Sequence, residues 1–171
     1  MVKTEDKEVS QLRNQVNTLQ AELDELQQYS RKNSLRIYGC KDNPSEVTDD
    51  IIKSLCSDKL GISLQKSDID CSRRLRRKEN GDRPIIVRFT SRNIKNLIFK
   101  HKAKLKGTKI VLKEDLTMRR TALYKQACNS FGYKRVWTND CNIYVKSGGH
   151  ISKIMTTADL ESLRAKSGTD T

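Results

Sequence analysis

The sequence predicts a mixed α+β fold in which an amino-terminal helix precedes two units of strands and helices. Three observations lead to this prediction: apolar residues with heptad spacing near the amino end, a β-α-β-β-α-β order of segments through the middle, and a shorter helix, hairpin and helix after it. We place a coiled-coil helix at residues 1–33, a middle domain at 34–115, a carboxy-terminal helix-hairpin-helix domain at 116–165 and a disordered tail at 166–171.

The amino-terminal segment carries apolar residues that alternate spacings of three and four, which is the a/d pattern of a coiled coil. Valine at a and leucine at d are compatible with a parallel dimer, and a trimer remains open. A second interpretation is that the stripe packs on the globular part of the same chain. We expect a homo-oligomer formed through Val9, Leu12, Val16, Leu19, Leu23 and Leu26.

The first half of the middle domain reads as strand, helix and strand. Leu35 to Tyr38 forms a short strand that Gly39 stops. A helical apolar face then runs from Ile51 to Leu60 and ends at Gly61, where a glycine suits a helix end. The stretch from Ile69 to Leu75 is a weaker strand.

The second half continues with strand, helix and strand. A turn at residues 78–82 leads into the strand Pro84 to Phe89, so that the two middle strands form a hairpin. A helix follows from Ser91 past Ala103, and Lys109 to Leu112 reads as the last strand. The complete order is that of the ferredoxin-like fold, which RNA-recognition motifs use.

The carboxy-terminal domain repeats this theme on a smaller scale. A helix is predicted from Met118 to Phe131, a hairpin from Val136 to Val145, and a final helix that Thr156 and Asp159 cap and that ends at Arg164. Because this unit is small, we expect it to lean on the preceding domain. Three of its aromatic residues are expected in the core or at the domain interface: Tyr133, Trp137 and Tyr144. For Trp137, the alternative is that it stacks on a base.

Charge is distributed unevenly along the chain. The net charge is +13 overall, and residues 1–30 hold 3 basic and 6 acidic side chains. The segment from Arg73 to Arg120 holds 17 basic and 4 acidic residues. Such a concentration suits a polyanionic partner, and a membrane surface would require a basic amphipathic helix rich in Trp, Phe and Leu. We therefore expect single-stranded RNA or DNA as the partner, and no membrane.

Several other classes of protein are disfavoured. The longest apolar runs are three residues, whereas a membrane span needs about 20. The charged amino end lacks the apolar stretch of a signal peptide, so we expect an intracellular protein with reduced cysteines. The sequence contains neither a P-loop nor an H-E-x-x-H motif, and its two histidines lack metal-ligand spacing. We expect no enzymatic activity and no cofactor.

Three sequence blocks carry a resemblance to a known family. They are Tyr29-Ser30-Arg31-Lys32-Asn33-Ser34-Leu35-Arg36-Ile37, Arg83-Pro84-Ile85-Ile86-Val87-Arg88-Phe89-Thr90, and Glu114-Asp115-Leu116-Thr117 with Arg119-Arg120. Together with the heptad helix, they resemble the first-open-reading-frame protein of non-LTR (LINE-type) retrotransposons, and the hairpin from Val136 to Val145 resembles the related few-polyhedra proteins of baculoviruses. The resemblance implies single-stranded nucleic-acid binding and nucleic-acid chaperone activity in a ribonucleoprotein particle, cytoplasmic or nuclear.

The candidate binding residues come from five places in the sequence. Basic side chains at the end of the coiled coil, in the second strand and in its hairpin loop would hold phosphates. For the hairpin, the alternative is that its basic residues are solvated and bind no ligand. Arg36 takes the position of a stacking ring, and a plain salt bridge is equally consistent with it. The resemblance implies roles for Arg88, Arg119 and Arg120. The full set is Arg31, Lys32, Arg36, Arg73, Arg74, Arg76, Arg77, Lys78, Arg88, Arg119 and Arg120.

These observations predict sequence-tolerant binding, because Pro84 and Ile86 replace the aromatic rings on which an RNA-recognition motif stacks bases. A polycation without a nucleotide-hydrolysing motif would act as a passive chaperone. One alternative function is an adaptor whose coiled coil and middle domain both contact proteins. Another is a role in particle assembly, in a viral or domesticated protein.

Overall fold

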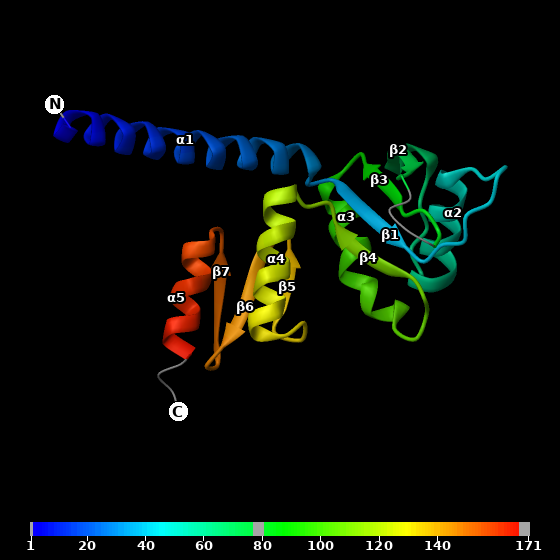
Figure 1. The fold of residues 1–171 in the computed structure, drawn as a ribbon. Coiled ribbons are helices and arrows are strands. Elements are labelled where there is room, and N and C mark those ends of the chain that lie inside the picture. Colours follow the sequence, from blue (N-terminus) through cyan, green and yellow to red (C-terminus); the bar gives the residue numbers. More distant parts are fainter. Residues whose placement is uncertain (1, 77–80, 168–171) are drawn as a thin grey trace.

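The computed structural model describes residues 2–76 and 81–167 and confirms a mixed α+β fold (Figure 1). A long amino-terminal helix, α1 (Val2–Arg31), leads into two lobes that each contain an antiparallel sheet. We call residues 34–114 the first lobe and residues 118–167 the second lobe. The free part of α1 projects away from both lobes, and its last turns lie beside the start of α4 (Figure 1).

Among its described residues, the first lobe contains four strands and two α-helices, and its strand order is β2-β3-β1-β4 with antiparallel neighbours. A π-helical turn extends the first helix beyond Leu55, and the turn ends at Gly61 in a left-handed conformation. The elements are β1 (Ser34–Tyr38), α2 (Thr48–Leu55), η1 (Cys56–Leu60), η2 (Lys66–Asp68), β2 (Ile69–Arg74), β3 (Ile85–Phe89), α3 (Arg92–Lys100), η3 (His101–Leu105) and β4 (Val111–Glu114).

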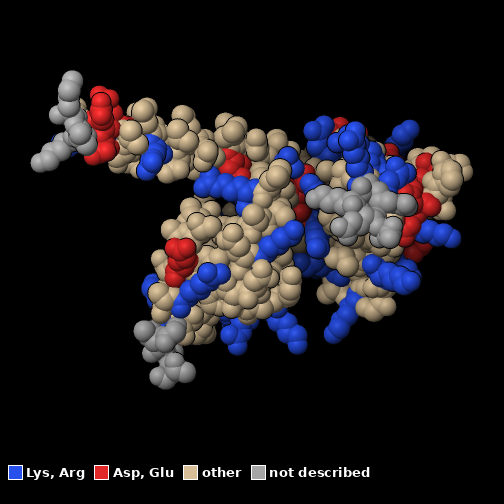
Figure 2. Space-filling model, in the orientation of Figure 1, with Lys and Arg blue, Asp and Glu red and all other residues tan. Residues whose placement is uncertain are grey.

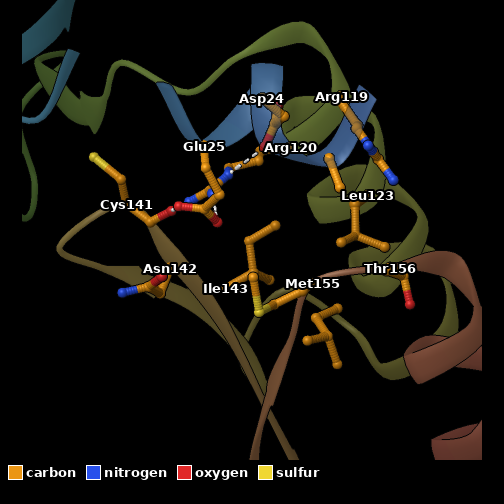
Figure 3. A pocket seen from close by; sticks show the side chains of 12 residues that line it. Asp24, Glu25, Arg119, Arg120, Leu123, Cys141, Asn142, Ile143, Met155 and Thr156 are labelled. Carbon is orange, nitrogen blue, oxygen red and sulfur yellow. Dashed lines mark hydrogen bonds and ion pairs between the residues drawn. The ribbon is translucent and has the colours of Figure 1, made fainter. Parts of the chain in front are cut away.

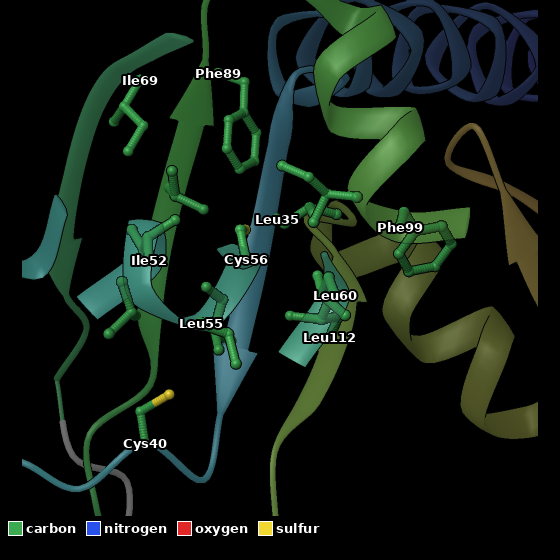
Figure 4. Packing of buried hydrophobic residues seen from close by; sticks show 14 of the residues in the cluster. Leu35, Cys40, Ile52, Leu55, Cys56, Leu60, Ile69, Phe89, Phe99 and Leu112 are labelled. Carbon is green, nitrogen blue, oxygen red and sulfur yellow. The ribbon is translucent and has the colours of Figure 1, made fainter. Parts of the chain in front are cut away.

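Alternation along the strands divides the sheet of the first lobe into a core face and an outer face. Leu35 and Ile37 of β1, like Val87 and Phe89 of β3, point into the core. Ile52 of α2 packs against the same face (Figure 4). Ile98 of α3 belongs to the same core cluster. The residues that alternate with the core positions therefore lie on the outer face.

The second lobe has its own core and a three-stranded sheet of order β5-β6-β7. Thr117 caps the first helix by accepting a hydrogen bond from the Arg120 backbone N–H, as its position in the sequence suggests. Leu123 and Leu160 pack with Ile143 and Ile154 on one face of the sheet. The elements are α4 (Met118–Phe131), β5 (Val136–Asn139), β6 (Asn142–Ser147), β7 (His150–Ile154) and α5 (Thr157–Ser167).

Three predicted boundaries are wrong. The last strand of the first lobe is β4, two residues later than predicted, because Glu114 is buried against Lys95 and continues the strand beside β1. The predicted hairpin has a third strand, β7, which pairs with β6 across a turn with positive φ at Gly148 and Gly149. Helix α5 includes residues 166 and 167 of the predicted tail, and residues 168–171 lie outside the described residues.

Helix α1 meets the rest of the chain with one face only. The Gln28 side chain is fully buried; it donates to the Asp115 carbonyl and accepts from the Thr117 N–H. The heptad residues Val9 to Leu26 are instead 46–70% exposed in the single chain. The stripe therefore does not pack on the chain's own lobes, which was the second interpretation of the heptad pattern.

Candidate nucleic-acid interface

A row of side chains crosses the outer face of the first lobe's sheet on all four strands. The strand register pairs Arg73 of β2 with Ile86 of β3, Ile86 with Arg36 of β1, and Arg36 with Lys113 of β4. Arg73 and Lys113 are exposed, and neither forms an ion pair with another residue in the described part of the chain. We call Arg36, Arg73, Ile86 and Lys113 the sheet row.

Arg36 is held in place by a buried carboxylate. Its Nε lies 2.7 Å from Asp115 Oδ1, and the side chain keeps about a third of its surface exposed. Burial lowers the pKa of Arg36 while the hydrogen bond and charge of Asp115 raise it, with a net rise, so the guanidinium stays charged. Arg31 Nη1 lies 3.5 Å from the same carboxylate. Two guanidinium groups thus share one carboxylate, which leaves an excess of positive charge at the edge of the sheet row.

A groove of about 580 Å³ lies between the end of α1 and the end of β3. Tyr29 is 72% exposed on its wall, and Lys32 Nζ lies 5.7 Å from the centroid of the Tyr29 ring. Arg88 lines the groove from the outer face of β3 and pairs with Asp70. The groove thus offers an exposed aromatic ring beside Lys32, while Asp70 neutralises Arg88. A ring next to a cation is the combination that single-stranded nucleic acid uses for stacking and phosphate contacts. It is lined by Tyr29, Ser30, Lys32, Asn33, Asp70, Arg88, Phe89, Thr90 and Arg92.

The predicted basic hairpin is divided by the structure. Arg73 belongs to the sheet row, and Arg76 is exposed just beyond β2. Arg77 and Lys78 lie outside the described residues. Arg74 points to the other side of the strand, as the alternation of a strand requires.

Arg74 is a buried anchor for the loop after β1. Its side chain is 5% exposed, and its Nε lies 2.5 Å from Glu46 Oε1. Its Nη1 and Nη2 also donate to the carbonyl oxygens of Cys40 and Lys41. The hydrogen bond from Arg74 is the main cause that holds the pKa of Glu46 below its ordinary value, so the carboxylate stays charged. With its donors occupied, Arg74 has a structural role, and we leave it out of the interface.

The two arginines at the start of α4 differ in burial, as Arg73 and Arg74 do. Arg120 is buried: Nε lies 2.9 Å from Asp24 Oδ2, and Nη2 lies 2.5 Å from Glu25 Oε1 (Figure 3). Arg119 points away from these carboxylates, is exposed, and forms no ion pair with any residue that the structure describes (Figure 3). Of this pair, only Arg119 is available to a ligand.

The described cations of residues 73–120 do not form a single trough of positive charge. Lys and Arg side chains gather over β2 and β3 in Figure 2, but Arg119 lies on the other lobe. Carboxylates from distant segments neutralise several cations of the 73–120 segment. These pairs are Arg74 with Glu46, Arg83 with Asp42, Arg88 with Asp70, Arg92 with Asp140, and Arg120 with Asp24 and Glu25.

Three residues of the interface were missed in the sequence. Lys113 was placed after the last strand, and the two-residue shift of β4 is what brings it onto the sheet row. Tyr38 ends β1 on the outer face, where its ring centroid lies 5.3 Å from Lys113 Nζ. Tyr29 does not belong to the heptad stripe, and its isolation there was the signal that could have identified it.

Comparison with models of known protein families gives no match, and comparison with curated proteins gives none either. In the described part of the chain, no helix has the length and apolar character that crossing a membrane requires.

Proposed function

We propose that this protein binds single-stranded nucleic acid on the sheet row and in the adjoining groove of the first lobe. The observation that carries the proposal is the sheet row, in which Arg73 and Lys113 flank Arg36 on one open face without carboxylate partners of their own among the described residues. Phosphate contacts of this kind hold a strand without reading its sequence. RNA or DNA would therefore bind with little sequence preference.

The order of elements in the first lobe supports an RNA-recognition-motif fold for residues 34–115. The strands run β2-β3-β1-β4, all neighbours are antiparallel, and both helices pack on one face. On this proposal the outer face is the binding face. Ile86 and Arg36 occupy its centre in place of aromatic rings, so that charge supplies more of the affinity than stacking does.

We further propose that α1 joins copies of the chain, because its exposed heptad stripe has the apolar pattern of a coiled coil and no cover in the single chain. Each copy would add one sheet row and one groove to a shared assembly, which raises the effective concentration of sites along a strand. Together with the resemblance to retrotransposon first-open-reading-frame proteins, these features support a passive nucleic-acid chaperone in a ribonucleoprotein particle.

The salt dependence of binding tests this proposal. We expect the affinity for a fluorescently labelled single strand, measured by anisotropy, to fall steeply between 50 and 200 mM salt. Replacing two phosphate-binding residues, Arg73→Gln with Lys113→Gln, should reduce the slope of log affinity against log salt by about 1.4, since each phosphate contact on a single strand contributes about 0.7.

A charge-matched variant, Lys59→Gln with Lys66→Gln, removes two exposed cations from η1 and η2 and should leave the slope unchanged. Binding that does not respond to salt would instead favour an adaptor that contacts proteins. Equal slopes for the two double variants would remove the sheet row from the interface.

A further inference from the structure

The outer face of the second lobe's sheet carries two aromatic rings outside the core. Trp137 of β5 and Tyr144 of β6 are register partners, their ring centroids lie 6.0 Å apart, and their planes differ by 17°. Both side chains are half-buried, whereas their strand neighbours Val136, Ile143 and Val145 are buried against α4 and α5. The two rings therefore lie outside the core, which was one of the two places expected for them, and they stack on each other with nearly parallel planes.

The charged side chains on this face of the sheet are basic. Lys153 of β7 is the register partner of Tyr144, so it extends the same row across the sheet, and Lys146 lies two residues along β6 on the same face. Strands β5, β6 and β7 contain no aspartate or glutamate. Both lysines are exposed, and neither forms an ion pair with another residue that the structure describes.

We propose that this face is a second binding surface for single-stranded nucleic acid, on which unpaired bases stack against Trp137 and Tyr144 while Lys146 and Lys153 contact phosphates. An aromatic pair on a sheet offers the π-face that every base can use, and flanking cations supply the attraction to the backbone. The charge complementarity favours a polyanion with flat apolar groups over a protein segment. This inference rests on the proposed function, because it assumes the same ligand class, but it assigns a separate site.

Arg92 connects the second surface to the first. It lines the groove beside Tyr29 and pairs with Asp140, which directly follows β5. The turn between β5 and β6 therefore sits next to the groove, and Trp137 lies three residues back along β5 from Asp140. A single strand that leaves the groove can continue over this turn onto the aromatic pair.

The experiment uses Trp137 as its own reporter, because it is the one tryptophan in the chain. The full-length protein is titrated with unlabelled oligo(dT), tryptophan fluorescence is recorded, and anisotropy of labelled oligo(dT) measures binding in parallel. Stacking should quench the fluorescence with the same midpoint as the anisotropy change. Oligonucleotides with 5-iodouracil should also cross-link on irradiation to the tryptic peptide 136–146, which contains both rings.

Substitutions give a second measurement. Tyr144→Leu and Trp137→Leu should each weaken binding about 5- to 150-fold, the range expected for loss of one stacked base. Trp137→Phe keeps a ring and should stay close to wild type. Tyr133→Leu removes an exposed aromatic of the same lobe that is not on a strand and should have no effect. Circular dichroism checks that each variant is folded.

Two results would overturn the proposal, and they are distinguishable. If oligo(dT) binds with normal salt dependence while tryptophan fluorescence and cross-linking of peptide 136–146 stay unchanged, the second surface is wrong and the proposed function stands. If no single strand binds at all, both fail.

Discussion

Arg120 Nε lies 2.9 Å from Asp24 Oδ2, although 96 positions separate the two residues in the chain. The same guanidinium donates through Nη1 to the Cys141 carbonyl at 3.0 Å, so α1, α4 and the turn between β5 and β6 meet at one side chain. Thr117 Oγ1 also donates to Asp24, at 2.5 Å. This junction sets how the second lobe sits against α1, and hence where Arg119 and the outer sheet face point.

Replacing Arg120 should destabilise the fold more than replacing its neighbour. We expect Arg120→Ala to lower the free energy of unfolding by about 3 kcal/mol, because Asp24 would remain a largely buried, unpaired carboxylate. Urea unfolding measures the change. Arg119→Ala is the control and should stay within about 0.5 kcal/mol, since its side chain is exposed. Similar losses for the two variants would contradict the assignment of Arg120 as a structural residue.

The buried pair of Lys95 and Glu114 makes a second stability prediction. Both side chains are 0% exposed, their Nζ and Oε1 atoms lie 2.5 Å apart, and Glu114 Oε2 accepts from the Cys141 N–H. Lys95→Met should cost about 3–5 kcal/mol, because it leaves a buried charge without a partner. Adding Glu114→Gln removes the charge and keeps an acceptor for Cys141, so the double variant should recover part of the loss in thermal unfolding. A double variant less stable than the single one would contradict this account.

Acid should weaken the cap of α5. The Asp159 carboxylate accepts from the Met155 and Thr156 N–H groups, and the bond from Met155 is the main cause that lowers its pKa from the ordinary value of 3.8. A lowered folded-state pKa means that the stabilisation is fully present above about pH 4 and is lost as the pH falls through the folded-state value.

We expect Asp159→Asn to cost roughly 0.3–1 kcal/mol at pH 7 in urea unfolding, since a carboxylate favours a helix amino terminus. The difference from wild type should shrink as the pH falls below about 4, where the wild-type carboxylate is itself protonated. Asp58→Asn, at an exposed position in η1, serves as a substitution of the same chemistry away from this cap. A difference for Asp159→Asn that grows towards acid would show the opposite sign and refute the cap.

Oligomerisation should depend on the heptad stripe. Val16→Asp places a charge at an a position and should shift the chain to monomers, because a buried charge without a partner outweighs the packing of a short coiled coil. Analytical ultracentrifugation measures the association state. Gln11→Asp puts the same charge on α1 outside the stripe and should leave association intact. If wild type and both variants sediment alike, the stripe does not mediate self-association.

The position of Tyr29 in the groove predicts that its ring contributes to binding by stacking, independently of the cations that contact phosphates. Tyr29→Ala should weaken the binding of a labelled single strand about 5- to 150-fold with little change in salt slope, because it removes a stacking ring and no cation. Tyr133→Ala is a close match, since Tyr133 is 71% exposed and lies on the second lobe. Anisotropy at constant salt compares the two, and an equal effect of both substitutions would argue against the groove.

Most helices and strands could be predicted because their signals are local. The heptad spacing of α1, Thr117 before α4, and the apolar run Ile85-Ile86-Val87 all act within a few residues, and the structure contains these elements close to their predicted bounds. The third strand of the second lobe was missed because its alternation is weak. It is defined by pairing with β6, from Ile143 opposite Ile154 to Ser147 opposite His150, which a single segment does not display.

The candidate site was less predictable, because a sequence shows where cations are and not which carboxylates they meet. The sequence by itself determined the heptad spacing of apolar residues in α1, the order of strands and helices in the first lobe, and the excess of positive charge. Only the tertiary structure decided that Arg74 and Arg120 are buried in ion pairs while Arg73 and Lys113 share an open sheet face. The physical reason is that the neutralising carboxylates come from segments far away along the chain, and folding alone brings those charges within hydrogen-bonding distance.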